Sequence, residues 1–374
     1  MRTFDVVVVG LGAMGAAALA NVAGRAPKVL GLEQRTPGHE GGSSHGESRV
    51  IRLANFENPA YGPLISRALQ TWKALEAHPG DIYLRTGILE AGLPRSTIVQ
   101  GTKAAARALG IEHVCMTPAE VRARFPVITL PEAWEGVFQP DGGIIRADRA
   151  IQRCLEAARA RGATVETQTR VRSIASVGDG VEIVTDRETI SAGAAIIASG
   201  PWIAELVPEL RPHLTLTRQV LAWFEPRQPE LAGPDSLPVF LFESEDDTVY
   251  GFPDFAGLGV KAASHRLGPR LSSADQAIRA PGEDDVAPVR QALERLLAPA
   301  AGPLRAATTC IYTSTPDEEF VIDVSPGHPR IAFASACSGH GFKFASAIGE
   351  ILADLALGQA PACDVSAFRL ARFA

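Results

Sequence analysis

The sequence has no excess of basic residues and no long apolar run. Its 36 Lys and Arg residues are outnumbered by 42 Asp and Glu residues, for a net charge of −6, whereas a nucleic-acid-binding surface carries a basic excess. No apolar stretch approaches the roughly 20 residues that a membrane-spanning helix needs. Neither a nucleic acid nor a membrane is therefore an expected partner.

Cysteines are few, and their spacing argues against a cross-linked or metal-bound framework. The five cysteines are scattered, odd in number and without a CxxC pair, so no disulfide framework and no metal site are expected. The N-terminal apolar run is short and ends in glycines, unlike the longer apolar region of a signal peptide. A reducing cytoplasm is therefore the expected location.

What the sequence does contain is a dinucleotide-binding pattern at its start. The segment "FDVVVVGLGAMG" is a short β-branched run that leads into Gly10, Gly12 and Gly15, and an Ala-rich helical segment follows. In this pattern the glycines make the tight turn, admit the pyrophosphate and let helix and strand pack closely. A second strand ends at Glu33, whose carboxylate can accept hydrogen bonds from a ribose diol. These features predict nucleotide binding, but they do not distinguish FAD from NAD.

The chain after Glu33 departs from the continuation that a NAD-binding domain needs. Further alternating strands and helices would be expected within about 150 residues. Residues 35–64 instead form a polar stretch that is rich in Gly, Ser and His and contains Arg49 and Arg52. It is too polar for a core strand and too long for a simple connection, and such loops often line a site. A solvated surface loop is the alternative interpretation.

The remaining chain predicts two further kinds of region. A buried strand ends in Ala198-Ser199-Gly200, small residues that let a backbone approach a cofactor closely. Residues 213–316 alternate like the strands of an antiparallel sheet, with one helical segment over 283–298. The length of 374 residues exceeds the usual size of a single core, so two domains are expected.

The chain ends in a predicted strand, a glycine-punctuated loop and a helix. The spacing of Phe344, Ile348, Ile351, Leu352 and Leu355 predicts a helix with one apolar face. Such a strand-loop-helix could rejoin the nucleotide domain, which would make both domains discontinuous.

Lys343 precedes this last helix in the segment "SGHGFKF". A cation is disfavoured at a helix N-terminus, and the two glycines around His340 would bring backbone N–H groups close to a ligand. An anion site that stabilises reduced flavin is the functional interpretation. A solvent-facing lysine is the alternative.

Lys261 and His265 are four residues apart in a predicted strand, "GVKAASH". Alternation along an extended strand places positions i and i+4 on the same face, so the two side chains can project together. A lysine inside an apolar strand is uncommon and often marks a site. A lone histidine, by contrast, is more often a hydrogen-bonded structural residue.

Cys310 lies in "AATTCIYTSTPDEEF", after two threonines and before a turn-like segment. A structural cysteine usually has apolar neighbours, so this polar setting calls for a different explanation. An inert strand thiol is the alternative.

Six segments together resemble the monomeric sarcosine oxidase and N-methyltryptophan oxidase family, FAD-dependent amine oxidoreductases of the D-amino acid oxidase superfamily. The segments are "VVVVGLGAMG", "GSSHGESRVIR", "YGFP", "GVKAASH", "CIYTSTPDEEFVID" and "SGHGFKFASAIGEI". The similarity runs nearly from end to end, in the same order and with similar spacing.

The resemblance implies an α/β fold (α+β overall) with two discontinuous domains. Residues 1–80, 145–212 and 318–374 would form a Rossmann-like FAD-binding domain. Residues 81–144 and 213–317 would form a mostly antiparallel β-sheet substrate domain.

The resemblance also implies site residues. Arg52 and Lys343 would grip the substrate carboxylate, and Lys261 would lie beside the flavin and assist O2 reduction. The catalytic residues that it implies are Arg52, Tyr250, Lys261, His265, Tyr312 and Lys343. The cofactor-binding residues that it implies are Gly10, Gly12, Met14, Gly15, Glu33, Gln34, Ser44, His45, Arg49, Val171, Ser199, Gly200, Trp202, Cys310, Gly339, Gly341, Phe342 and Lys343.

The implied cofactor is FAD, held covalently by a thioether from Cys310 to the flavin 8α-methyl. The implied reaction oxidises an N-methyl or N-alkyl amino acid to an imine, which hydrolyses, while O2 becomes H2O2. The expected partners are such an amino acid and O2, and the expected protein is a monomer. An amino-acid dehydrogenase that uses another acceptor and a non-catalytic flavin-binding module are the alternatives.

Overall fold

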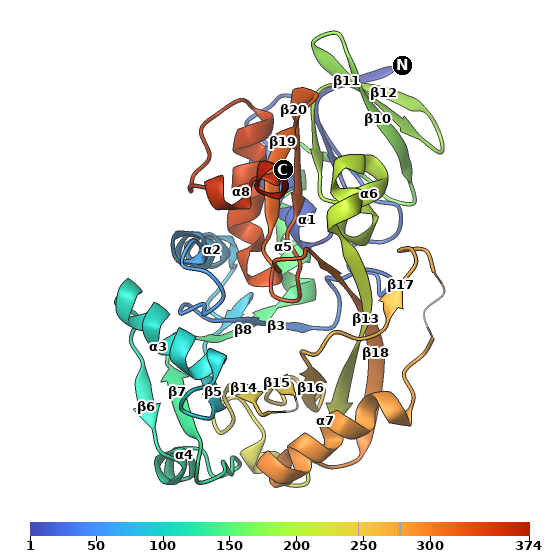
Figure 1. The fold of residues 1–374 in the computed structure, drawn as a ribbon. Helices are drawn as coiled ribbons and strands as arrows, with labels where there is room; N and C mark the ends of the chain where they lie inside the picture. Colours follow the sequence, from blue (N-terminus) through green and yellow to red (C-terminus); the bar gives the residue numbers. More distant parts are fainter. Residues whose placement is uncertain (246, 277–278) are drawn as a thin grey trace.

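The computed structural model describes residues 1–245, 247–276 and 279–374, which fold into two large β-sheets with helices on their outer faces (Figure 1). The helices are α1 (Ala13–Val22), α2 (Tyr61–Leu75), α3 (Thr97–Leu109), α4 (Pro118–Arg124), α5 (Ala147–Ala160), α6 (Ile203–Leu206), α7 (Glu283–Leu296) and α8 (Ala345–Ala356).

The first sheet is mixed and contains the two strands of the dinucleotide pattern. Its central order is β10-β11-β12-β1-β2-β9, and β20 pairs with both β12 and β19. The strands β1, β2, β9, β12 and β20 run parallel, while β10, β11 and β19 pair antiparallel. The bounds are β1 (Arg2–Val9), β2 (Val29–Leu32), β9 (Thr164–Glu166), β10 (Val171–Val177), β11 (Gly180–Thr185), β12 (Thr189–Ile197), β19 (Val321–Ser325) and β20 (His328–Ser335).

Alternation along β1 explains why this sheet is covered on both faces. Val6 and Val8 pack into a core with the small and aliphatic residues of α1, α5 and α8, whereas Val7 and Val9 pack into a second core with α6. A strand that is buried on both faces reads as a continuous apolar run, as "VVVV" does. The cores therefore fix the carboxyl end of β1 between two layers.

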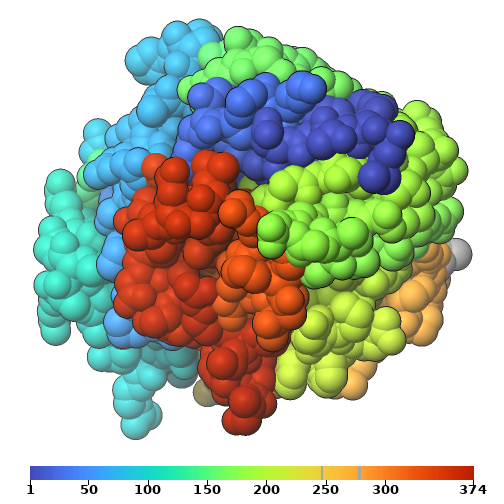
Figure 2. Space-filling view, turned by 90° about the horizontal axis from the view of Figure 1, so that it is seen from above, coloured from blue at the N-terminus to red at the C-terminus, as the bar shows by residue number. Residues whose placement is uncertain are grey.

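Segments that are distant in the sequence meet in this part of the molecule. In the view from above, the N-terminal segment, the middle of the chain and the C-terminal segment share one face (Figure 2). The parallel pairing of β12 with both β1 and β20 brings them together.

The second sheet is mostly antiparallel, as its alternation predicts. Its order is β17-β13-β16-β15-β14-β5-β7-β6, with β18 paired to β13, and only β14 and β5 run parallel among its described strands. One face packs against α4 and α7. The bounds are β5 (Ile88–Gly92), β6 (Val114–Met116), β7 (Glu135–Gln139), β13 (Thr215–Phe224), β14 (Val239–Glu243), β15 (Thr248–Phe252), β16 (Val260–Ser264), β17 (Arg270–Leu271) and β18 (Leu304–Ser314).

A third, small sheet corrects the prediction that residues 35–64 hold no core strand. Strand β3 (Ser48–Ile51) pairs with β8 (Gly143–Arg146), which also pairs with β4 (Tyr83–Leu84). Ser48 and Ile51 are buried. Polarity was misleading here because this strand's polar groups are satisfied inside the protein, where Ser48 Oγ accepts from Lys261 Nζ at 3.2 Å.

The last helix also differs from its prediction of one apolar face. Every residue of α8 except Glu350 is buried, because α1, α2 and β20 surround the helix. Helix α4 begins with a capping box, in which Thr117 and Glu120 exchange hydrogen bonds.

No helix within the described ranges has the length and apolarity to cross a membrane. The same residues contain no group of three or more His, Cys, Asp or Glu side chains that could hold a metal ion.

Candidate active site

One cavity of about 550 Å³ extends from the β1–α1 turn to the second sheet. It collects most of the predicted site residues from both ends of the chain. Its lining includes Gly10, Gly12, Met14, Glu33, Gln34, Ser44, Arg49, Arg52, Val171, Ser199, Gly200, Trp202, Tyr250, His265, Cys310, Tyr312, Gly339, Gly341, Phe342 and Lys343. Three predicted residues, Gly15, His45 and Lys261, are not part of this lining.

The β1–α1 turn needs its glycines for backbone reasons. Gly10 has a φ of +84°, and a Cβ there would lie 2.7 Å from the carbonyl oxygen of Ala198. A Cβ on Gly15 would lie 1.7 Å from the carbonyl oxygen of Gly10. Gly15 therefore acts from outside the cavity, by letting α1 approach the turn.

Glu33 follows β2 and is oriented by the backbone around it. Its Oε2 accepts from the N–H of Leu11 at 2.8 Å, and its Oε1 accepts from the N–H of Arg35 at 2.9 Å. A carboxylate has about four acceptor positions, so two remain for the hydroxyl groups of a ribose. The side chain is buried and lines the cavity.

At the dinucleotide end of the cavity, two buried hydroxyl groups support the fit to FAD, which the sequence alone did not reveal. The hydroxyl oxygens of Ser199 and Thr313 are buried without a hydrogen-bond partner in the described structure, and both residues line the cavity. A buried polar atom without a partner is costly. A polar ligand such as a dinucleotide would satisfy both atoms.

Strand register explains why the second sheet presents its functional side chains together. Residues directly opposite each other in neighbouring strands project from the same face. Phe252 lies opposite Lys261, which in turn lies opposite Trp223. Leu241 lies opposite Tyr250. Leu241, Tyr250 and Phe252 line the cavity, whereas Lys261 and Trp223 lie on the same face of the sheet but outside the lining.

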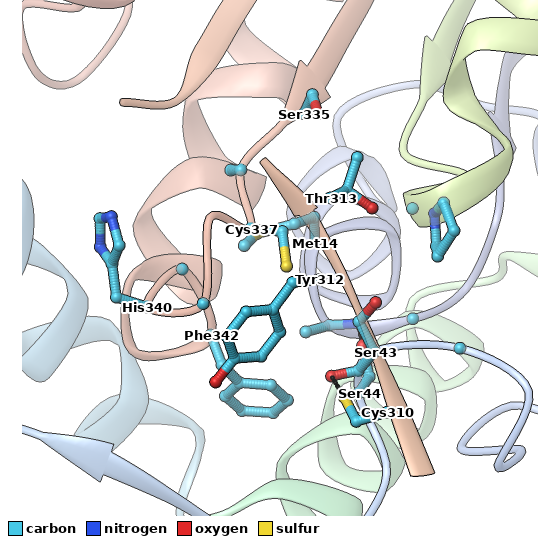
Figure 3. Close-up of a pocket in the computed structure, with 18 of the residues that line it drawn as sticks. Met14, Ser43, Ser44, Cys310, Tyr312, Thr313, Ser335, Cys337, His340 and Phe342 are labelled. Carbon is cyan, nitrogen blue, oxygen red and sulfur yellow. Dashed lines mark hydrogen bonds between the residues drawn. The ribbon is translucent and has the colours of Figure 1, made fainter. Parts of the chain in front are cut away.

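Cys310 and Tyr312 belong to this same face through β18. Cys310 is only 3% exposed, and its Sγ lies 3.9 Å from the carbonyl oxygen of Ser43. Burial raises the pKa of its thiol, although Arg49 opposes the shift. In the close-up the thiol lies beside Ser43 and Ser44 (Figure 3).

Arg49 holds the polar stretch of residues 35–64 in place beside Phe342. Its guanidinium donates to the carbonyl oxygens of Ser43 at 2.9 Å, His45 at 2.6 Å and Ser48 at 2.8 Å, and lies 5.5 Å from the ring centre of Phe342. Burial and the nearby Arg49 and Lys261 charges lower the pKa of His45 to about 4.

Lys261 lies behind the cavity wall. Its Nζ donates to the carbonyl oxygens of Gly46 at 2.7 Å and Ser48 at 3.0 Å, and to the Ser48 hydroxyl. Burial, reinforced by Arg49, lowers its pKa well below the usual range. Three acceptors around one amine satisfy all the donors of an ammonium.

His265, Tyr250 and Tyr312 form an aromatic cluster in the cavity. The His265 ring centre lies 6.3 Å from that of Tyr250 and 6.1 Å from that of Tyr312. The two tyrosine hydroxyl oxygens are 3.5 Å apart. Burial raises the pKa of both tyrosines and lowers that of His265, so all three side chains are neutral at pH 7.

Arg52 and Lys343 both line the cavity. Lys343 is buried, so the alternative of a solvent-facing lysine is wrong. It is 3% exposed, and it lies in a 3₁₀ turn, Phe342–Phe344, just before α8. Its Nζ donates to the His340 carbonyl at 2.8 Å. Burial lowers its pKa to about 7, against the charge of Glu57.

Sequence reasoning missed two carboxylates that contact Arg52. Glu57 pairs with its Nη2, and Glu90 lies 3.2 Å from its Nη1. Glu90, on β5, is fully buried. Its signal was present in "GILEAG", a charged residue inside an apolar strand, which is the criterion that singled out Lys261.

The fold and the cavity together define an α/β nucleotide-dependent oxidoreductase with a second, mostly antiparallel sheet over its site. The chain belongs to the FAD dependent oxidoreductase family, whose model matches residues 5–355. FAD is accordingly the cofactor of this family's fold, and the cradle described above fits it.

Three relatives span nearly the whole chain. Monomeric sarcosine oxidase of Bacillus sp. (strain NS-129) is 36% identical over 99% of this chain and 97% of its own. N-methyl-L-tryptophan oxidase of Yersinia pestis (strain Pestoides F) is 32% identical over 99% of both. The structure of NikD, an unusual amino acid oxidase essential for nikkomycin biosynthesis, has a TM-score of 0.86 at 25% identity and covers 99% and 98%.

Proposed function

We propose that the protein is an FAD-dependent oxidase of N-methyl or other N-alkyl amino acids. It converts them to imines, which hydrolyse to an amine and an aldehyde or keto product, while O2 is reduced to H2O2. The observation that carries the proposal is one continuous cavity that holds both the dinucleotide cradle and the cluster of Arg52, Lys343, Tyr250 and His265. Relatives named for oxidising sarcosine and N-methyl-L-tryptophan support the substrate class.

The side chains of the cavity bind and orient the substrate. When bound, FAD supplies the redox chemistry, accepting a hydride equivalent and passing its electrons to O2. Arg52 and Lys343 bind the carboxyl group of the substrate, for which a guanidinium fork and a point charge are both suited. Tyr250 and His265 flank the amine.

Lys261 acts on O2 in this proposal. Burial lowers its pKa, but its three acceptors, the carbonyl oxygens of Gly46 and Ser48 and the Ser48 hydroxyl, favour the charged ammonium and hold it in place. A fixed positive charge in a dry site stabilises the negative charge that develops on O2 as it is reduced.

Cys310 holds the flavin through a thioether to its 8α-methyl in this proposal. Its place in the cavity, beside Ser43 and away from bulk water, supports the assignment. Forming this thioether would remove one hydrogen from the thiol and one from the flavin methyl group, and O2 would accept both as H2O2. The resulting bond prevents loss of the cofactor by dissociation.

Acid precipitation tests this attachment directly. Yellow colour should stay with the precipitated wild-type protein and should move to the supernatant for Cys310→Ser, because serine cannot form the thioether. Cys115→Ser, at an exposed site, is the matched control and should behave as wild type. Wild-type colour in the supernatant would rule out the covalent link.

The domain boundaries, the oligomeric state and the location are also proposals. We assign residues 1–80, 145–212 and 318–374 to the FAD-binding domain, and 81–144 and 213–317 to the substrate domain, which the strand content of the two sheets supports. A cytoplasmic location fits five unpaired cysteines, and relatives named monomeric sarcosine oxidase support a monomer.

A panel of N-methyl amino acids tests the function. Purified protein in air should release one H2O2 for each substrate consumed, and artificial electron acceptors should not be required. Turnover that needs such an acceptor would identify a dehydrogenase instead. Absence of turnover with every member of the panel would refute the proposal.

A further inference from the structure

The guanidinium of Arg52 is bound by carboxylates on two edges. Its Nη2 pairs with Glu57, which lines the cavity, and its Nη1 lies 3.2 Å from Glu90, which lies outside the lining. The group also stacks on Phe56, with Cζ 4.1 Å from the ring centre. The inner edge of Arg52 is thus fixed by a buried carboxylate, while its outer edge faces the cavity.

The contacts of Glu90 oppose the effect of its burial and favour its ionised form. Gln139 Nε2 donates to it at 2.6 Å, and the orientation of this amide is fixed because Gln139 Oε1 accepts from the N–H groups of Ala54 and Leu53. Arg52 can only donate, and Thr102 Oγ1 donates at 3.1 Å. Burial raises the pKa of Glu90, with Arg52 opposing it. Arg52 and the Gln139 amide nitrogen can only donate, so both favour the charged carboxylate over the neutral acid.

The carboxyl-binding end of the cavity is therefore close to neutral overall. Below about pH 7, where Lys343 keeps its proton, two cations, Arg52 and Lys343, face two carboxylates, Glu57 and Glu90. Burial alone would raise the pKa of Glu57, but Arg52 and Lys343 lower it to about 2. His340, whose Nδ1 is 4.0 Å from Glu57, is neutral because burial lowers its pKa to about 3.

The two groups that face the cavity have opposite hydrogen-bonding characters. Arg52 Nη2 is a donor, whereas Glu57 Oε2 is a buried acceptor that lacks a partner among the described residues. A free carboxylate presents acceptors only and would oppose Glu57. A carboxamide presents a carbonyl acceptor and an N–H donor, so it complements both.

We propose that this cavity accepts the amides of N-alkyl amino acids, including N-terminal residues in peptide linkage, alongside the free acids. Glu90 is the positioning residue behind this selectivity, because its charge offsets that of Arg52. The inference rests on the proposed oxidase function and names the class of its substrate.

Matched acid and amide pairs test the inference. Sarcosine with sarcosinamide, and N-methyl-L-tryptophan with its amide, should give kcat/KM values within about tenfold of each other in the wild type. Glu90→Gln keeps the shape but removes the charge, so it should shift the acid-to-amide ratio toward the acid by about tenfold or more. Comparing ratios between proteins cancels the lower basicity of the amide's amine.

Thr102→Val is the matched control, since it removes one hydrogen bond to Glu90 but no charge, and it should leave the ratio unchanged. A wild-type preference for acids of more than about tenfold overturns the proposal even if Glu90→Gln fails to fold. An unchanged ratio in folded Glu90→Gln also overturns it. If neither acids nor amides react, the oxidase function itself has failed, a distinguishable result.

Discussion

The two ends of the cavity are built in different ways. At the dinucleotide end, the backbone of the β1–α1 turn shapes the site. The site depends on the absence of a side chain at Gly10, Gly12 and Gly15. At the substrate end, charged side chains from three distant segments meet: Arg52 is bound by Glu57 and Glu90, and Lys343 lines the same cavity. Local backbone geometry therefore determines the dinucleotide end, whereas the balance of charges from distant parts of the chain determines the substrate end.

This difference decides how each end responds to change. A steric change at a backbone cradle affects folding and cofactor together, because the neighbouring atoms are main chain and cannot move aside. A charge change at the substrate end alters binding of one class of ligand and leaves the cofactor in place.

Gly15→Ala should give the largest effect and break the dinucleotide end. The added Cβ would lie 1.7 Å from the carbonyl oxygen of Gly10, so α1 must move, at a cost of about 3 kcal/mol or more. We expect little soluble protein and no bound flavin, measured by the 450-nm absorbance per protein. Gly233→Ala, where a Cβ meets nothing within 4 Å, is the control, and a flavin-loaded Gly15→Ala would contradict the cradle's role.

Arg52→Gln should break the substrate end while sparing the cradle. Losing the charge-assisted contact should lower kcat/KM for acid substrates by about 100-fold or more. Glu90 would also lose its charged partner, at about 3 kcal/mol of unfolding free energy. Flavin content should stay at the wild-type level. Arg85→Gln, in an exposed pair with Asp141, should change none of these, and equal loss of flavin in Arg52→Gln would show that the ends are not separable.

Lys343→Met should sharpen the comparison through the pH dependence of the unfolding free energy. The folded pKa of Lys343 is lowered to about 7 from 10.5, so between these values the unfolded chain holds a proton that the folded protein has released. Wild type should therefore gain unfolding free energy relative to Lys343→Met as pH rises from about 7 to about 10. Urea unfolding at several pH values measures this.

Lys28→Met, at an exposed position, should show no such trend. A constant difference between wild type and Lys343→Met would mean that Lys343 is not desolvated in the folded protein.

The same contrast explains what the sequence could predict. Gly10, Gly12, Gly15 and Glu33 lie in one β-turn-α-β unit whose spacing is local, so the cradle could be predicted from the chain alone. The alternation over 213–316 likewise predicted the second, mostly antiparallel sheet.

Other features depend on tertiary packing, and prediction failed there. The burial of α8 on nearly all sides is imposed by α1, α2 and β20, and strand β3 pairs with β8, which lies 92 to 98 residues later in the chain. Glu57 and Glu90 gain their significance only when the fold brings Arg52 between them. The resemblance implied Arg52 and Lys343, but not the carboxylates that balance them.

Anaerobic titration is the most direct test of one cavity that holds both a flavin and an amine. Under argon, one equivalent of a substrate identified by the peroxide panel should bleach one equivalent of bound flavin in wild type, and the bleaching should require a much higher concentration in Arg52→Gln. Flavin that keeps its colour while the same amino acid disappears would place the chemistry elsewhere and contradict the account.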